Sequence, residues 1–330
     1  MAKLQLGMTC ANYDRTRALF DGRVQIDGVE LVPTALEPEE AFHRAFKFGE
    51  FDITELSMSS HTVMTSRGEA AYVGVPAFLS RVFRHSGIYI NTTKGIKRPE
   101  DLRGKAVGVP EYQITANVWI RGLLSDEYGV KPEEVHWRRG GIEQAGRGER
   151  SPIKLPAGVD LQQIPDAKTL SGMLESGELD ALISARAPSC FLRGSPKVAR
   201  LFGDYKQAEI DYYKRTKLFP IMHMVGIRRE LVEKHPWLPV NVYKGFLEAK
   251  RLAMHDLNEI NMLLVTLPWV VHEYNASREL MGDDYWPYGV HENMHQLEVF
   301  TRYHHEQGLS VRRVRPEELF APSTVELSKI

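Results

Sequence analysis

The chain has 330 residues, 43% of them hydrophobic, and its 42 Lys and Arg nearly balance its 43 Asp and Glu. This length is enough for two packed lobes, while the balanced charge argues against a nucleic-acid partner and the short apolar runs argue against a membrane span. Two cysteines provide no disulfide framework, and the N-terminal run lacks the apolar core of a signal peptide, so we expect a cytoplasmic chain.

The first third of the chain alternates expected strands with expected helices. A short helical piece ends at Phe20, and Glu39 and Glu40 in a first turn predict a helix over 38–48. Asp27-Gly28 lies between two alternating runs and predicts a hairpin turn. Strands are predicted at 4–8, 51–56, 72–76 and 87–91.

Hydroxyl side chains follow the strand predicted at 51–56. The run at 57–61 (Ser-Met-Ser-Ser-His) opens a helix, because serines favour helix N-caps. Ser59 is therefore either a residue of the capping turn or a ligand for an anion or a hydroxyl. Glu55, at the strand end, is either a buried acid or a satisfied edge residue.

A second predicted strand-to-helix turn lies in the middle of the chain. An apolar run at 105–109 predicts a buried strand, and a helical pattern begins near Thr115 and ends near Gly129. Free backbone N–H groups and the positive end of the helix dipole at such a turn bind a carboxylate or a phosphate well. Tyr112, Gln113 and Thr115 add side-chain donors. The alternative is that Thr115 is only an N-cap and Tyr112 only a turn aromatic.

Arginines and histidines mark further candidate positions. Arg81, Arg84 and His85 are interleaved with apolar residues, and an arginine matches a carboxylate with two parallel hydrogen bonds. Arg186 follows a strand predicted at 178–183, where a ligand carboxylate can be bound. His223 lies in an apolar run, which is typical of a hydrogen-bonded core histidine but is also consistent with a hinge at the edge of a site.

The remaining segments complete an α/β pattern. Residues 140–158 are rich in Gly, Pro and charge and predict a loop or an exposed excursion. Residues 291–295 spell His-Glu-Asn-Met-His, the zinc-protease motif. No third ligand follows at a familiar spacing, so we interpret the motif as coincidence and predict no metal site. Strands are predicted at 135–139 and 160–164, and helices at 169–177, 229–235, 240–258, 266–281 and 291–308.

Alternating strands and helices favour α/β layers. Residues 93–222 form a self-contained α/β section and predict one lobe, while 1–92 together with 223–330 predict the other. Such a chain crosses twice between lobes, so we expect a ligand cleft where the carboxyl ends of the strands face each other.

Several motifs resemble known proteins. The layout resembles the type II periplasmic-binding-protein fold, and within it the chain is similar to the 4,5-dihydroxyphthalate decarboxylase family. The residues that carry the family resemblance are 74–81 (Gly-Val-Pro-Ala-Phe-Leu-Ser-Arg), 83–86 (Phe-Arg-His-Ser), 98–105 (Arg-Pro-Glu-Asp-Leu-Arg-Gly-Lys), 108–113 (Gly-Val-Pro-Glu-Tyr-Gln), 115–116, 118–119, 284–289 and 316–323. The segment at 98–105 is general to the fold, whereas 108–113 is more specific.

The resemblance implies non-oxidative loss of CO2 from a hydroxylated aromatic carboxylate, 4,5-dihydroxyphthalate giving protocatechuate. We assign roles from chemistry, because the resemblance brings no secure catalytic motif. Ring protonation followed by CO2 loss needs cations for the carboxylates, a general acid and a group that orients the phenol. We expect His85 or His223 as the acid, with Glu55 behind it. The substrate-binding candidates are Ser59, Arg81, Arg84, Tyr112, Gln113, Thr115, Arg186 and Tyr288.

Two other classes of protein stay open at this point. A solute-binding protein of an ABC-type uptake system would use the same cleft and arginines without catalysis, and the lack of an export signal is the feature against it. A cytoplasmic ligand sensor or precursor-synthesis protein is a further alternative, because fold alone does not assign function. The sequence requires no cofactor and leaves room for a divalent metal. It predicts a small aromatic carboxylate as ligand, no nucleic acid, no membrane, and a homo-oligomer as an option.

Overall fold

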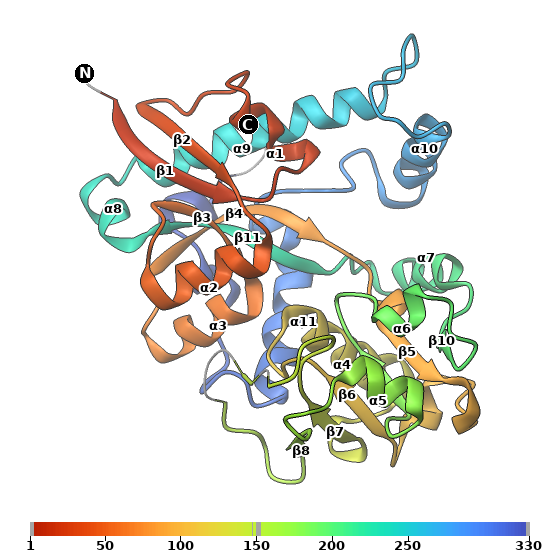
Figure 1. Ribbon diagram of the computed structural model, residues 1–330. Coiled ribbons are helices and arrows are strands. Elements are labelled where there is room, and N and C mark those ends of the chain that lie inside the picture. The colour runs from red at the N-terminus through yellow and green to blue at the C-terminus, as the bar shows by residue number, and fades with distance from the viewer. Residues whose placement is uncertain (1–2, 147, 150–152, 328–330) are drawn as a thin grey trace. The chain divides into compact units, whose positions relative to one another are not determined.

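The computed structural model of the chain describes residues 3–146, 148–149 and 153–327. Contacts divide the chain into two compact units, which are drawn together in Figure 1. Unit 1 comprises Met1–Arg81, Ile221–Leu297 and Val314–Ile330, and unit 2 comprises Val82–Pro220 and Glu298–Arg313. The lobes expected from the sequence differ from these units at residues 82–92, 221–222 and 298–313.

Unit 1 contains, within the described residues, a five-stranded sheet in the order β2-β1-β3-β11-β4. Strand β1 is parallel to β2 and β3, whereas β11 is antiparallel to β3 and β4. The strands are β1 (Leu4–Cys10), β2 (Val29–Ala35), β3 (Ile53–Ser57), β4 (Tyr72–Arg81) and β11 (Ile221–Arg228). The predicted hairpin at Asp27-Gly28 is wrong, because β2 is parallel to β1 and helix α1 (Asp14–Phe20) lies in the connection between them.

Helices α2, α3 and α9 pack against strands of this sheet (Figure 1). Pro38 occupies the first turn of α2, and Gly49 ends that helix with a positive φ of 60°, a conformation that favours glycine. The Ser57 side chain caps α3 by accepting from the Ser60 N–H. The helices after α1 are α2 (Pro38–Phe48), α3 (Met58–Arg67), α8 (Arg229–Lys234), α9 (Leu238–Leu257), α10 (Val270–Met281) and α12 (Pro322–Val325).

Unit 2 contains, in the part of the chain that is described, a six-stranded sheet in the order β10-β5-β9-β6-β7-β8. Strand β6 is parallel to β7 and β9, and β7 is parallel to β8, so their carboxyl ends share one edge. Strand β5 is antiparallel to both of its neighbours. The strands are β5 (Ile88–Asn91), β6 (Ala106–Val109), β7 (His136–Arg139), β8 (Asp160–Gln163), β9 (Ala181–Ile183) and β10 (Val198–Arg200).

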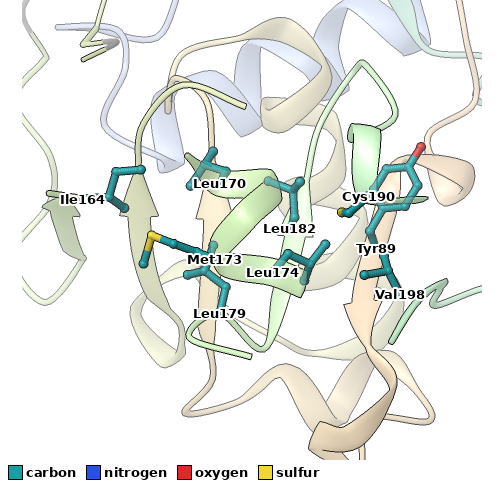
Figure 2. Close-up of a cluster of buried hydrophobic side chains, with 9 residues drawn as sticks. All are labelled: Tyr89, Ile164, Leu170, Met173, Leu174, Leu179, Leu182, Cys190 and Val198. Atoms are coloured by element: carbon teal, nitrogen blue, oxygen red, sulfur yellow. The ribbon is translucent and has the colours of Figure 1, made fainter. Parts of the chain in front are cut away.

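A cluster of buried apolar side chains forms a core of unit 2 beneath helix α5 (Figure 2). Leu170 and Leu174 of α5 meet Leu182 of β9 in this cluster, and Cys190 is fully buried there. The helices of this unit are α4 (Thr115–Tyr128), α5 (Leu170–Ser176), α6 (Ser189–Leu192) and α7 (Tyr205–Thr216). The predicted excursion at 140–158 falls partly outside the described residues, at 147 and 150–152.

The C-terminal part of the chain contributes to both units. Helix α11 (Met294–Glu306) begins in unit 1 and continues into unit 2. A short 3-10 turn, η5 (His291–Asn293), precedes it, and another, η6 (Pro316–Leu319), lies in unit 1. The other 3-10 turns are η1 (His85–Gly87), η2 (Thr92–Lys94), η3 (Pro99–Leu102) and η4 (Pro132–Glu134). No helix in the described ranges is both long and apolar enough to cross a bilayer.

Candidate functional site

A buried carboxylate and a histidine meet on one face of the unit 1 sheet. Val225 of β11 pairs with Glu55 of β3, and His223 pairs with Ser57. Residues two apart in a strand share a face, so the register makes Glu55 and His223 diagonal neighbours. The Glu55 carboxylate accepts hydrogen bonds from His223 Nδ1 at 2.7 Å, from the Tyr13 hydroxyl at 2.8 Å and from the Ala11 N–H at 3.1 Å.

These contacts determine the charge state of Glu55. Complete burial opposes ionisation, but the hydrogen bond and charge of His223, with the Ala11 and Tyr13 donors, hold the pKa of Glu55 below its usual range. Burial and the Glu55 charge raise the pKa of Tyr13, which therefore stays a neutral donor. Glu55 is thus an anion at neutral pH that orients the imidazole through Nδ1.

The other imidazole nitrogen is available for chemistry. Glu55 is completely buried, whereas 19% of the His223 side chain is exposed. In the described part of the chain, Nε2 of His223 makes no hydrogen bond. The edge of the His223 ring packs against Phe42, with ring centroids 4.8 Å apart. A proton can therefore be exchanged at Nε2 while the buried carboxylate holds the ring in place.

Two residues near this histidine were missed by sequence reasoning. Arg15 lies against the rings of Tyr13 and Trp286, with its guanidinium carbon 4.2 and 4.4 Å from their centroids. Its Nε donates to the Leu79 carbonyl at 2.7 Å. Both Tyr13 and Arg15 follow β1, whose carboxyl end shares an edge with that of the parallel strand β3. A polar turn directly after the first strand was the signal that could have identified them.

The other predicted residues of unit 1 lie in the interior. The Arg81 guanidinium donates to the Pro287 carbonyl at 2.7 Å, to Gln296 at 3.1 Å and to Asn293, and so ties β4 to the C-terminal segment. Tyr288 is buried next to it, its hydroxyl has no hydrogen-bond partner among the described residues, and burial raises its pKa. Ser59 is fully buried in the first turn of α3. Substrate binding by these three residues stays a prediction.

In unit 2, the turn before α4 binds a carboxylate that belongs to the chain itself. The N–H groups of Tyr112 and Gln113 donate to the two Glu149 oxygens at 2.5 and 3.3 Å, and Arg139 lies 3.7 Å from the same carboxylate. Burial, followed by the Glu111 charge, raises the pKa of Glu149, although these donors and Arg139 oppose the shift. Thr115 is buried as the first residue of α4. The sequence predicted a ligand's carboxylate at this turn, and substrate binding by Tyr112, Gln113 and Thr115 stays a prediction.

The remaining candidates of unit 2 lie apart from that turn in the chain. His85 is buried, with its ring edge-on to Phe202 and Tyr212. Burial lowers its pKa to about 4, so it is neutral at pH 7, and neither ring nitrogen has a partner in the described residues. Burial also lowers the pKa of Arg84 to about 10, against the opposing charge of Glu209. Arg186 is exposed just beyond β9.

The two histidines of the zinc-protease motif lie in different elements. His291 lies in the 3-10 turn η5 and His295 in helix α11, so the two histidines do not share a continuous α-helix. His291 Nε2 is 3.5 Å from Glu326. Across the described ranges, no three His, Cys, Asp or Glu side chains are grouped so as to hold a metal ion.

Comparison with known proteins supplies the wider context. No protein-family model matches the chain. A 4,5-dihydroxyphthalate decarboxylase of Comamonas testosteroni is 49% identical over 330 residues, which cover 100% of both chains. A 4,5-dihydroxyphthalate decarboxylase of Pseudomonas putida is 51% identical over 214 residues, which cover 65% of this chain and 83% of that one.

Solved structures establish the fold. The periplasmic aliphatic sulphonate binding protein SsuA from Escherichia coli superposes with a TM-score of 0.52 at 14% identity, covering 98% of this chain and 99% of SsuA. At this identity the likeness concerns the fold alone, and it confirms the predicted periplasmic-binding-protein-like α/β fold. The ligand cleft expected between the lobes stays a prediction.

The Glu55 contacts make stability depend on pH. Because the pKa of Glu55 is lower in the folded chain, the unfolded chain binds this proton more tightly. The stabilisation that the ionised Glu55 provides is complete well above its ordinary pKa of 4.5 and is lost as the pH falls through its pKa in the folded chain.

We expect Glu55→Gln to lose about 1–3 kcal/mol of unfolding free energy at neutral pH, and we expect this loss to become smaller in acid. Urea unfolding at several pH values measures this, with exposed Glu30→Gln as the control; a loss independent of pH would contradict it.

Proposed function

The chain belongs to the 4,5-dihydroxyphthalate decarboxylase family, and on this premise we propose that it converts 4,5-dihydroxyphthalate to protocatechuate and CO2 without an oxidant. The family membership supports the reaction and the substrate. The observation that carries the chemical part of the proposal is the hydrogen bond of 2.7 Å between the buried Glu55 carboxylate and His223.

The reaction needs a proton donor at the ring. Direct loss of CO2 would leave a ring carbanion, which is a poor intermediate. Protonation of the carbon that bears the carboxylate avoids this, because the hydroxyl para to that carbon donates electron density to the ring. The C–C bond to the carboxylate then breaks, its electron pair restores the aromatic ring, and CO2 leaves. One proton enters the ring for each CO2 released.

His223 is the proposed general acid. Its Nε2 makes no hydrogen bond within the described chain, while Nδ1 donates to Glu55. The hydrogen bond to Glu55 fixes the ring orientation, so Glu55 acts through His223 and does not need to touch the substrate. Of the two histidines that the sequence offered, His85 is the weaker acid candidate, because its pKa near 4 leaves it neutral at pH 7.

The turn before α4 is the proposed carboxylate receptor of unit 2. Its backbone N–H groups hold the Glu149 carboxylate, so a carboxylate of the substrate would meet the same donors once Glu149 leaves. In unit 1, Arg15 is a second candidate cation for the substrate.

We also propose that the chain works in the cytoplasm. Both cysteines are unpaired and buried, as suits a reducing compartment such as the cytoplasm. A divalent metal is not part of the proposed mechanism, and a chelator tests whether turnover requires one.

The reaction itself is tested with the purified full-length chain and 4,5-dihydroxyphthalate. We expect CO2 release together with the change of the ring spectrum to that of protocatechuate. The same assay is run with and without a chelator, and activity that survives chelation is expected from protonation by His223. Tight binding without CO2 release would contradict the enzyme assignment and favour a binding protein.

Replacing the proposed acid separates catalysis from binding. His223→Gln keeps a polar side chain of similar reach but cannot deliver a proton as imidazolium. We expect kcat to fall by roughly 10²–10⁴-fold, with a much smaller change in KM. His255→Gln is the matched control, because the side chain of His255 is exposed on α9. An unchanged kcat in His223→Gln would remove His223 from the proposed role.

Replacing Glu149 tests the carboxylate receptor. If Glu149 competes with the substrate for the turn, Glu149→Ala lowers KM by roughly 3–10-fold and leaves kcat unchanged. Glu143→Ala is the control from the same loop, because Glu143 binds Ser189 instead. Steady-state kinetics of the two variants measure the difference. A raised KM in Glu149→Ala would show that Glu149 supports the turn rather than competing at it.

A further inference from the structure

The connection between α9 and α10 exposes a long apolar segment of unit 1. Ala253 is the last buried residue of α9, and from 254 to 269 no residue is buried. Six large apolar side chains in this connection are between 47% and 73% exposed. They are Ile260, Met262, Leu263, Leu264, Leu267 and Trp269, and we call residues 259–269 the apolar loop.

The apolar loop stands beyond the end of α9, away from the sheet of unit 1 (Figure 1). Helix α10, which follows it, buries only Val270. The apolar residues of the loop therefore do not contribute to a core of their own unit. Exposed apolar residues this close together in the chain favour an interaction site, because monomeric proteins rarely leave a large apolar surface uncovered.

The area of the apolar loop suits a protein interface. A fully exposed Trp side chain offers roughly 200 Å² and a large aliphatic one about 100–150 Å², so the exposed parts of these six amount to roughly 450–600 Å² per copy. Each partner in a standard stable interface buries about 800 Å². Two copies of the loop packed together would therefore supply most of the area that a stable dimer needs. Helix α10, which follows the loop in the chain, would be next to this contact.

The charge of the apolar loop favours a second copy of the same chain. Glu259 is its only charged residue, and none follows until His272 and Glu273. A two-fold axis places the same surface of both subunits in contact, so an uncharged patch meets its own copy without like-charge repulsion. The absence of Lys and Arg removes the attraction that an anionic lipid surface would need.

We propose that the apolar loop is the contact between two copies of this chain, arranged around a two-fold axis. Burial of the six apolar side chains from each copy drives the association. The interface would involve unit 1, and the loop contains none of the residues that bind Glu55. The proposal does not depend on the reaction that the chain catalyses.

Light scattering coupled to gel filtration tests this on the full-length chain. We expect the wild type to have at least twice the mass of one chain, and Leu263→Asp/Trp269→Asp to lose at least half of the wild-type mass. Leu192→Asp is the matched control, since Leu192 is 71% exposed but lies in unit 2; its mass is expected to equal that of the wild type. A wild type with the mass of one chain, or a double variant that keeps the wild-type mass, overturns the proposal.

A second measurement covers the case in which the Asp variant does not fold. Thr266→Cys places one reactive thiol in the apolar loop, while Cys10 and Cys190 are buried. A short bifunctional maleimide is expected to link two Thr266→Cys chains and not two wild-type chains. Absence of the linked dimer overturns the proposal, as does co-sedimentation of a single-chain wild type with phosphatidylcholine vesicles, which would make the loop a membrane contact instead.

Discussion

The hydrogen bond between Glu55 and His223 is the interaction on which both the interior of unit 1 and its proposed chemistry depend. An ionised carboxylate with no exposure costs several kcal/mol unless it is paired, and β11 brings the paired imidazole from 168 positions away in the sequence. Strand β11 lies between β3 and β4, so the chain must return from unit 2 before the sheet is complete and the charge is compensated. The same strand therefore completes the sheet and brings His223 to Glu55.

Buried charges elsewhere show how this fold distributes its polar groups. Arg81 and Arg121 are almost completely buried, and their guanidinium groups donate to carbonyls and amide side chains of their own units. Such cations stabilise the fold, because an unpaired buried charge would be costly. His223 differs from them: one ring nitrogen is bound to Glu55 and the other is left without a partner in the described chain. That asymmetry, rather than charge alone, distinguishes a candidate catalytic group from a structural one.

Sequence patterns predicted local structure well where local forces decide it. The helix at 38–48 has the predicted bounds, because Pro38 begins it and Gly49 ends it through contacts within a few residues. The turn before α4 does present free N–H groups, which donate to Glu149, because such groups at a helix start are a local property. The hairpin predicted at Asp27-Gly28 is wrong, because a turn signal does not reveal which strand the next segment will pair with.

The sequence by itself determined the α/β class, most strands and helices, the family resemblance and Glu55 and His223 as separate candidates. Only the tertiary structure decided that these two residues bind each other and that the Tyr13 hydroxyl also donates to the Glu55 carboxylate. It likewise decided that Glu149 occupies the turn at Tyr112. It also placed His85 in the interior beside two aromatic rings, where burial lowers its pKa to about 4. The reason is physical: secondary structure follows from neighbouring residues, whereas strand order, burial and the pairing of charges depend on residues that are far apart in the chain.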